Sequence, residues 1–167
     1  GEVLPRILLG RLERQRDALA VHVDVENLDG DLLADLDNLK RKLDAGATRA
    51  ITNYFFDNPT FLRFLDLALA AGITAPIVPG ILPITRFPHM LKFAKRCGTS
   101  VPDWLVHRFD GLEDDPETRR LIAASFAIEQ VKRLQQNGVT EFHFYTLNRP
   151  DLTYAIAHIL GARPAKV

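Results

Sequence analysis

The sequence predicts an α/β protein in which helices cover a parallel sheet. Short runs of β-branched and aromatic residues alternate with helical patterns from about residue 18 to the end, and this alternation is typical of βαβ units. Glycine and proline separate the two kinds of segment. The 167 residues are 47% hydrophobic and 25% charged, which is the composition of one globular domain.

Four strands are predicted, and each is short and apolar enough to be buried on both faces of a sheet. They cover residues 19–25, 50–56, 75–81 and 141–147. Residues 4–18 carry charges at helical spacing, so we expect a helix over residues 1–17, followed by the βα units of residues 18–163. Four units make half of a (β/α)8 barrel or a small open sheet.

The helices between the strands have their own start and stop signals. Residues 32–43 have leucines at helical spacing, and Asn58-Pro59 and Asp115-Pro116 are typical helix starts. Shorter helices are expected near 87–96, 102–109 and 151–160. The buried face of the long helix after Asp115 is predicted to contain Leu121, Ala124, Ser125, Ile128, Val131 and Leu134.

Charge and composition exclude several classes of function. Lysine and arginine number 21, as do aspartate and glutamate, so the chain lacks the broad positive field of proteins that bind nucleic acid or anionic membranes. Residues 67–84 are uncharged, but glycines and prolines interrupt them too often for a membrane span. Cys97 is the single cysteine, which excludes an internal disulfide and fits a cytoplasmic location. The five histidines lack metal-ligand spacing, so no metal is expected.

One candidate site lies on the helix predicted at residues 32–43. Its polar face carries Asp35, Asn38, Arg41 and Lys42, opposite the leucines. Adjacent arginine and lysine suit a diphosphate, because arginine forms paired hydrogen bonds and lysine acts as a point charge. The alternative is a solvated helix face with ion pairs four residues apart.

A second group of candidates follows the strands, at the ends where βα folds bind ligands. Asn53 is an amide among apolar neighbours, which predicts either a ligand contact or hydrogen bonds to nearby backbone. Tyr145 and Arg149 lie at the end of the fourth predicted strand. His143, between two phenylalanines, is expected to be a core residue and not a base.

Five stretches together resemble the bacterial methylenetetrahydrofolate reductase family, in the C-terminal half of its catalytic barrel. They are NLKRKLDAGA (38–47), RAITNYFFD (49–57), PIVPGILPI (76–84), EQ (129–130) and FHFYTLNR (142–149). Asn53 stands where the family usually has a glutamine that binds the pterin. Residues 22–29 read HVDVENLD where the family usually has Tyr-Pro-Glu-x-His-Pro-Glu-Ala.

The resemblance implies a (β/α)8 flavoprotein that uses NADH or NADPH to reduce FAD and then converts 5,10-methylenetetrahydrofolate to 5-methyltetrahydrofolate. It implies that FAD contacts Asp35, Asn38, Arg41 and Lys42. It places the substrate at Asn53, Phe93, Tyr145 and Arg149. The family's general acid belongs to the first half of the barrel, so no catalytic residue is expected in this chain.

Two other functions remain open on the sequence. The chain could be a truncated or diverged half-barrel without catalytic activity that binds a nucleotide or a partner chain, or a small open α/β binding domain. Half of a barrel leaves sheet edges unpaired, and such edges recruit partners. We therefore expect a homo-oligomer or a complementing chain, with folate as the substrate and neither nucleic acid nor membrane as a partner.

Overall fold

A computed structural model describes residues 6–9, 20–26, 32–84, 86–146 and 150–162, and the statements below concern these residues. Their strands form one five-stranded sheet in which every neighbouring pair is parallel. The spatial order is β1-β5-β4-β3-β2. The strands are β1 (Arg6–Leu9), β2 (Ala20–Val23), β3 (Arg49–Tyr54), β4 (Ile77–Ile81) and β5 (Glu141–Phe144).

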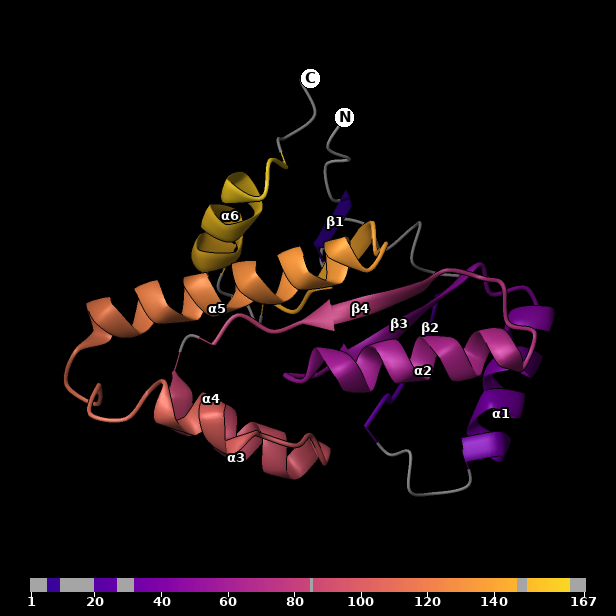
Figure 1. Cartoon of the computed structure of the whole chain (residues 1–167), viewed down its shortest axis with the longest axis horizontal. Coiled ribbons are helices and arrows are strands. Elements are labelled where there is room, and N and C mark those ends of the chain that lie inside the picture. Colours follow the sequence, from indigo (N-terminus) through magenta and orange to yellow (C-terminus); the bar gives the residue numbers. More distant parts are fainter. Residues whose placement is uncertain (1–5, 10–19, 27–31, 85, 147–149, 163–167) are drawn as a thin grey trace.

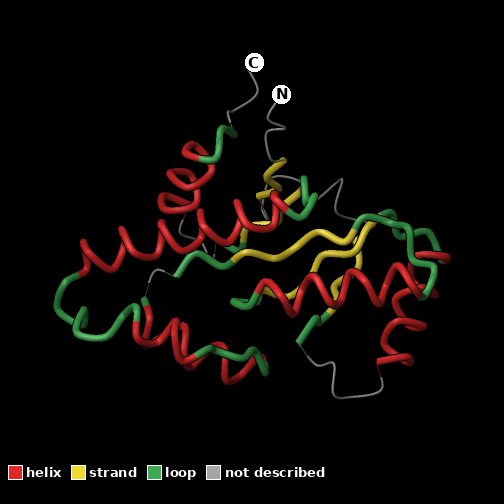
Figure 2. Tube along the Cα trace, in the orientation of Figure 1, coloured by secondary structure: helices red, strands yellow, loops and turns green. Residues whose placement is uncertain are grey.

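Helices follow β2, β3, β4 and β5 in the alternation that the sequence predicts (Figures 1 and 2). They are α1 (Leu32–Asp44), α2 (Asn58–Ala70), α3 (Phe87–Cys97), α4 (Asp103–His107), α5 (Pro116–Gln136) and α6 (Pro150–Ile159). The helix α5 packs against both α2 and α6. In the described part of the chain, no helix combines the length and the apolar character needed to cross a membrane.

The prediction of one parallel sheet is confirmed. Strands β2 to β5 lie in chain order, as consecutive units of a (β/α)8 barrel do, and each predicted strand coincides with an observed one. The observed strands are shorter, however. Residues 55–56 and 145–146 lie just beyond β3 and β5, so the predicted strands included residues of the loops that follow.

The predicted N-terminal helix is wrong where the structure describes it. Arg6–Leu9 is a strand that pairs in parallel with Glu141–Phe144, at the edge of the sheet opposite β2. An unpaired edge of β5 would leave backbone donors and acceptors without partners, and pairing with Arg6–Leu9 satisfies them. The free energy gained from this long-range strand pairing outweighs the helical preference of the local charge pattern. The remaining residues of that prediction lie outside the described part of the chain.

Two of the helix starts show how side chains satisfy free backbone N–H groups. The α2 cap is Asp57, one residue before the predicted Asn58, and its carboxylate accepts from the backbone N–H of Thr60 at 3.2 Å. At α5 the predicted cap is confirmed, because Asp115 accepts from the backbone N–H of Thr118 at 2.9 Å. The hydrogen bond from the Thr118 hydroxyl, and then that from the Thr118 backbone N–H, lower the pKa of the Asp115 carboxyl.

The buried face of α5 differs from the predicted one. Leu121 is 67% exposed and Ser125 is exposed, whereas Val131 and Leu134 are buried as predicted. The buried stripe consists of Ala123, Phe126, Ala127, Gln130, Val131 and Leu134. The buried face is rotated relative to the predicted one because the large Phe126 ring packs against the rings of Phe56 and Trp104. Burying Phe126 removes more apolar surface from water than burying Leu121 would.

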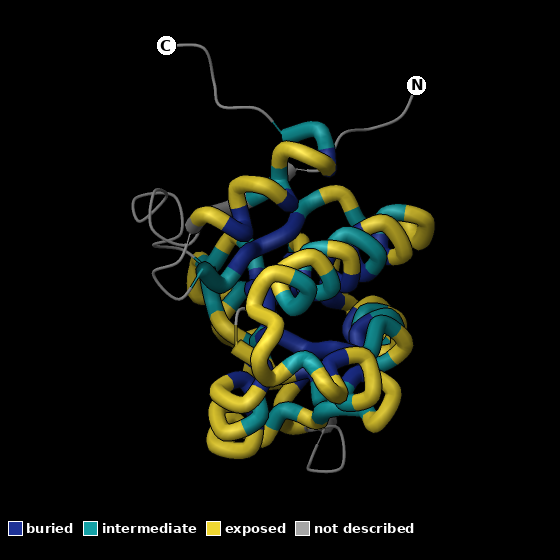
Figure 3. Tube along the Cα trace, turned by 90° about the vertical axis from the view of Figure 1, so that its left-hand side faces the viewer, coloured by how far each residue is buried: buried dark blue, intermediate teal, exposed yellow. Residues whose placement is uncertain are grey.

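Most of the core lies between the sheet and its helices, where Phe55 and Phe61 stack with ring centroids 5.0 Å apart. A smaller cluster contains Ile51 and Val78, with Ala20 packed against it. Figure 3 shows buried strand segments inside a shell of helices whose outer faces are exposed. The predicted burial is confirmed for β3, β4 and β5. It is wrong for β2, whose residues are only partly buried and whose His22 is exposed, because β2 lies at the edge of the sheet.

One ion pair spans three strands of the sheet. Arg49 Nη1 on β3 lies 3.1 Å from Glu141 Oε2 on β5, and β4 runs between these two strands. Both side chains are mostly shielded from solvent, with 20% and 25% exposed. Shielding strengthens the attraction relative to pairs on the surface.

We expect a double-mutant cycle of Arg49→Met and Glu141→Gln to give a coupling of about 1 kcal/mol in the free energy of unfolding. The matched control is the exposed pair of Arg120 and Asp151, whose charged atoms lie 2.9 Å apart. Exposed pairs typically give a coupling of about 0.2–1 kcal/mol, and we expect this pair to lie near the lower end of that range. Urea unfolding of the four proteins in each cycle measures both values. Equal coupling in the two cycles would contradict the role assigned to shielding.

Candidate active site

The carboxyl ends of β2 to β5 bring polar and aromatic side chains together at one edge of the sheet. Asp24 follows β2, Asn53 and Tyr54 end β3, and Tyr145 follows β5. These residues are separated by up to 121 positions, and parallel pairing alone places them at the same edge. Ligands bind at this edge in βα folds.

Thr52 joins the ends of three strands. Its hydroxyl accepts a hydrogen bond from Gly80 N–H of β4 at 2.9 Å and donates to the carbonyl of Asn53 at 2.8 Å. Its own carbonyl accepts from the Tyr145 hydroxyl at 2.9 Å. A Cβ on residue 80 would lie 2.6 Å from a ring carbon of Tyr145 and closer still to the Thr52 carbonyl oxygen. Only glycine lets the Tyr145 ring cross β4.

An aromatic cluster covers this end of the sheet, and Tyr54 is at its centre. Its ring stacks on Phe93 of α3 with centroids 5.6 Å apart and meets the edge of Tyr145 at 6.3 Å. Burial raises the pKa of Tyr145 to about 12, and burial also raises the pKa of Tyr54. Both phenols therefore stay protonated near neutral pH. His143 is buried, as predicted, and its ring meets Tyr145 at 4.8 Å.

Asp24 connects the aromatic cluster to the helix that carries the other predicted residues. Its carboxylate accepts a hydrogen bond from Asn53 Nδ2 at 3.4 Å. Asp24 also lines a cavity of about 170 Å³ between β2 and α1, together with His22, Val23, Asp35, Asn38, Leu39 and Lys42. Three of the four residues predicted to bind FAD thus share one cavity.

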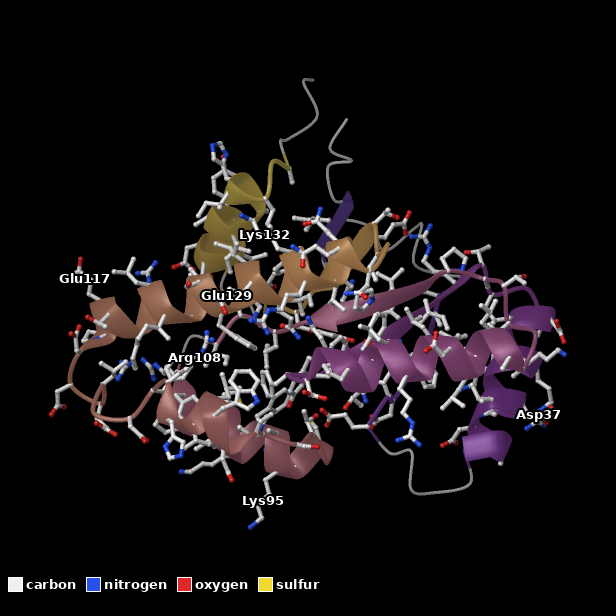
Figure 4. The ribbon with its side chains drawn as sticks, in the orientation of Figure 1. Asp37, Lys95, Arg108, Glu117, Glu129 and Lys132 are labelled. Atoms are coloured by element: carbon white, nitrogen blue, oxygen red, sulfur yellow. The ribbon has the colours of Figure 1, made fainter. Side chains whose placement is uncertain are left out.

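Arg41, the fourth predicted residue of α1, is not among the residues that line this cavity. Its guanidinium lies 3.5 Å from Asp37, one helical turn away, and both side chains are 71% exposed. Figure 4 shows Asp37 on the outer side of α1. The geometry of Arg41 is that of the solvated helix face, whereas Lys42 is exposed and lines the cavity. Arg149 lies outside the described residues.

Glu26, which the sequence motifs did not single out, is a half-buried carboxyl group just beyond β2. Its Oε2 accepts from the backbone N–H of Ser100 at 2.6 Å, which ties the end of β2 to the segment between α3 and α4. Burial raises the pKa of Glu26, the nearby Asp24 and Asp57 charges raise it further, and the Ser100 hydrogen bonds oppose the rise. The sequence feature that could have indicated Glu26 is its position directly after a predicted strand.

The described side chains can bind part of a dinucleotide through hydrogen bonds and charge, but they form no site for a metal ion. Within the ranges that the structure describes, no three His, Cys, Asp or Glu side chains are arranged to hold a metal ion. In the β2–α1 cavity, Lys42 suits phosphate oxygens, and Asp35 and Asn38 suit hydroxyl groups. At about 170 Å³ the cavity admits one part of such a ligand and not the whole of it.

Comparison with known proteins identifies the family. The family model for methylenetetrahydrofolate reductase matches residues 17–161. This chain belongs to the methylenetetrahydrofolate reductase family. The resemblance seen in the five sequence stretches is thereby confirmed.

The 5,10-methylenetetrahydrofolate reductases of two bacteria are close relatives in sequence. The protein of Pectobacterium carotovorum is 56% identical over 131 residues, which cover 78% of this chain and 44% of that protein. The protein of Escherichia coli is 51% identical over 144 residues, which cover 86% of this chain and 47% of that protein. The chain spans about half the length of these methylenetetrahydrofolate reductases.

More distant relatives support the same family and fold. Methylenetetrahydrofolate reductase (NADH) 1 of Arabidopsis thaliana is 37% identical over 145 residues, covering 84% of this chain and 24% of that protein. A solved structure from Clostridium thermocellum, an uncharacterized protein that binds two copies of 5-methyl-5,6,7,8-tetrahydrofolic acid, superposes with a TM-score of 0.59. It is 16% identical and covers 93% of this chain and 63% of that one, so it supports the fold alone.

We expect Gly80→Ala to lower the free energy of unfolding by about 1–3 kcal/mol, because the added methyl group has no room between Thr52 and Tyr145. Tyr145→Phe is the matched control, because it removes the hydrogen bond to Thr52 and keeps the ring, at a cost of about 1 kcal/mol. Urea unfolding measures both variants. A Gly80→Ala protein as stable as the wild type would contradict the close approach.

The raised pKa of Glu26 predicts how stability depends on pH. A folded-state pKa above the unfolded value means that the folded state binds the proton more tightly, so stability falls as pH rises from about 4.5 through the raised pKa. Glu26→Gln keeps an acceptor for Ser100 and removes the titration. The stability of the wild type relative to Glu26→Gln should therefore decline over this range. A constant difference would contradict the prediction.

Proposed function

We propose that this chain acts as the C-terminal half of the catalytic barrel of a methylenetetrahydrofolate reductase. In this role it takes part in reducing 5,10-methylenetetrahydrofolate to 5-methyltetrahydrofolate. The observation that carries the proposal is the packing of Phe93 and Tyr145 on Tyr54 at the end of β3, where Asn53 contacts Asp24. Asp24 lines the cavity that Asp35, Asn38 and Lys42 share. Relatives at 51–56% identity carry this enzyme's name.

The cofactor in this proposal is FAD, reduced by NADH or NADPH. When bound, the flavin supplies the hydride chemistry, and the protein supplies binding and orientation. Lys42 would neutralise phosphate charge, and Asp35 and Asn38 would accept or donate hydrogen bonds to hydroxyl groups. Arg41 would join Lys42 at the diphosphate only by leaving Asp37, an exchange that costs little because both side chains are exposed.

The substrate in this proposal lies against the aromatic cluster. Phe93 is partly exposed and stacks on Tyr54, so its free face can receive a flat ring. The Asn53 amide, held by Asp24 at 3.4 Å, keeps an oxygen to accept from the ring. Tyr145 forms the floor of the substrate site with its ring, because its hydroxyl already donates a hydrogen bond to the Thr52 carbonyl. Arg149 is the remaining residue proposed to contact the substrate, and only the family resemblance supports this role.

A flavin titration of single and double variants tests the cofactor proposal. Lys42→Ala should weaken FAD binding at least about tenfold, since a charge-assisted hydrogen bond contributes about 1.5–3 kcal/mol. Arg41→Ala should have a smaller effect, and the double variant should lose about 100-fold or more. Visible flavin absorbance of the purified chain gives the first readout. Equal FAD affinity in the wild type and all variants would reject the α1 site.

A half-barrel that binds ligands without catalysis is the second candidate, and the β2–α1 cavity favours it because Asp35, Asn38 and Lys42 offer groups for binding. The family's general acid is expected in the other half of the barrel. Under this candidate the chain binds FAD or folate and shows no NAD(P)H-dependent reduction of methylenetetrahydrofolate. Measured NAD(P)H oxidation by the purified chain, dependent on the folate, would reject it.

We further propose that the chain associates with a second copy or with a complementing chain. Strands β1 and β2 are the two edges of the described sheet, and parallel edge strands carry unpaired backbone groups that recruit partners. Sedimentation should therefore show a dimer or larger assembly, or a weakly cooperative melt of the monomer. A stable monomer with one cooperative thermal transition would contradict this.

A further inference from the structure

The helix α3 carries Phe93 over Tyr54, but burial holds this helix only as far as Ala94. The buried residues of α3 are Phe87, Met90 and Ala94. Residues 95–98 are all exposed, and Figure 4 shows Lys95 pointing away from the rest of the protein. Phe93 lies at the border of this exposed turn. Segments with few buried apolar contacts open most easily, so the position of Phe93 depends on what holds the turn after it.

Short contacts join this exposed turn to Glu26. Thr99 N–H donates to the Ala94 carbonyl at 3.0 Å, which fixes the first residues after α3. The next residue, Ser100, donates from its backbone N–H to Glu26 Oε2 at 2.6 Å, and its hydroxyl donates to the same oxygen at 3.4 Å. A displacement of Ser100 is therefore passed to Ala94, the neighbour of Phe93.

The contact between Glu26 and Ser100 spans the carboxyl end of β3. Glu26 lies just beyond β2, and Ser100 lies in the segment between α3 and α4, which follows β4. In the sheet, β3 runs between β2 and β4. Cys97, the last residue of α3, and Thr99 lie next to the Tyr54 hydroxyl. The end of α3 and the segment after it therefore close over Tyr54, and Glu26 ties them to the end of β2.

Most groups around Glu26 disfavour its charged form. Partial burial of the carboxyl is the largest cause, and Asp24 and Asp57 add charges of the same sign from the end of β2 and the β3–α2 loop. Ser100 opposes them with its two hydrogen bonds, and the nearby Tyr54 hydroxyl is neutral. The net result is a raised pKa of the Glu26 carboxyl. The proton is bound more tightly while Glu26 contacts Ser100 than when Glu26 is free in water, so loss of the proton favours release of Ser100.

We propose that Glu26 is a positioning residue of the strand-end site, the group of side chains at the carboxyl ends of β2 to β5. By binding Ser100 it holds the end of α3 in place, and so it keeps the Phe93 ring on Tyr54. Ionisation of Glu26 weakens this hold. The inference rests on the proposed function only in taking Phe93 as a ring that meets the substrate. A substrate ring stacked on Phe93 then binds more weakly when Glu26 releases Ser100.

Exchange of the Ser100 amide hydrogen, followed by NMR in the full chain without ligand, measures the hold directly. Glu26→Ala removes the acceptor, so this amide should exchange about tenfold faster than in the wild type. Glu26→Gln keeps an acceptor oxygen and should restore most of the protection. The matched control is Asp66→Ala, which removes an exposed carboxylate from α2 and should leave the exchange of Ser100 unchanged.

The pH profile separates a titrating hold from a fixed one. The ratio of Ser100 protection in the wild type to that in Glu26→Gln should fall as pH rises from about 4.5. Taking the ratio at each pH removes the intrinsic effect of pH on exchange. Over the same range, the nuclear Overhauser contacts between the rings of Phe93 and Tyr54 should weaken in the wild type and persist in Glu26→Gln. A hydrogen bond with only a structural role would give a constant ratio.

Three results would overturn the proposal. They are unchanged Ser100 exchange in Glu26→Ala, which shows that water replaces the carboxylate; a constant ratio across the pH range; or unchanged ring contacts between Phe93 and Tyr54 in Glu26→Ala, which shows that the buried part of α3 suffices. Circular dichroism verifies the folding of each variant, and if Glu26→Ala is not folded, the ratio between the wild type and Glu26→Gln decides alone. Flavin titration tests the proposed function separately, so its failure leaves this ligand-free measurement in force.

Discussion

The close approach of three strands at Thr52 is the constraint on which the strand-end site depends. The Thr52 hydroxyl and carbonyl bind Gly80 of β4 and Tyr145 beyond β5, so one fully buried residue holds the ends of β3, β4 and β5 together. This geometry requires glycine at position 80. Parallel pairing brings the strand ends to one edge, and this contact sets the spacing of the side chains there.

The aromatic cluster rests on that arrangement and extends it to the helices beyond β4. Tyr54 packs between Tyr145 and Phe93, so α3 is held over the end of β3. Glu26 adds a polar link, because it accepts from Ser100 in the segment after α3. A half-buried carboxylate near Asp24 and Asp57 is costly when ionised, as its raised pKa shows. The contact with Ser100 offsets part of this cost.

One short segment joins the strand-end site to the helical layer. Residues 55–58 begin next to Tyr54 and end in the first turn of α2. Gln130 of α5 holds this segment through the Phe55 carbonyl.

The sequence by itself determined the class of the fold, the order of its βα units and the family, because these depend on local periodicity, on glycine and proline positions and on short motifs. It also indicated Asp35, Asn38 and Lys42, which share a helix face, and their common cavity follows from that spacing. The distinction between Lys42 and its neighbour Arg41 required the structure, since it depends on which side of α1 meets β2.

Other features were decided by tertiary structure alone. Local charge pattern predicted a helix at Arg6–Leu9, but a free edge of β5 made a strand more favourable there. The buried face of α5 follows the packing of Phe126 against rings from α4 and the β3–α2 loop. Glu26 and Gln130 gained their roles from partners 74 and 75 residues away. Contacts at such separations leave no periodic signal, because they exist only once the sheet has brought distant segments together.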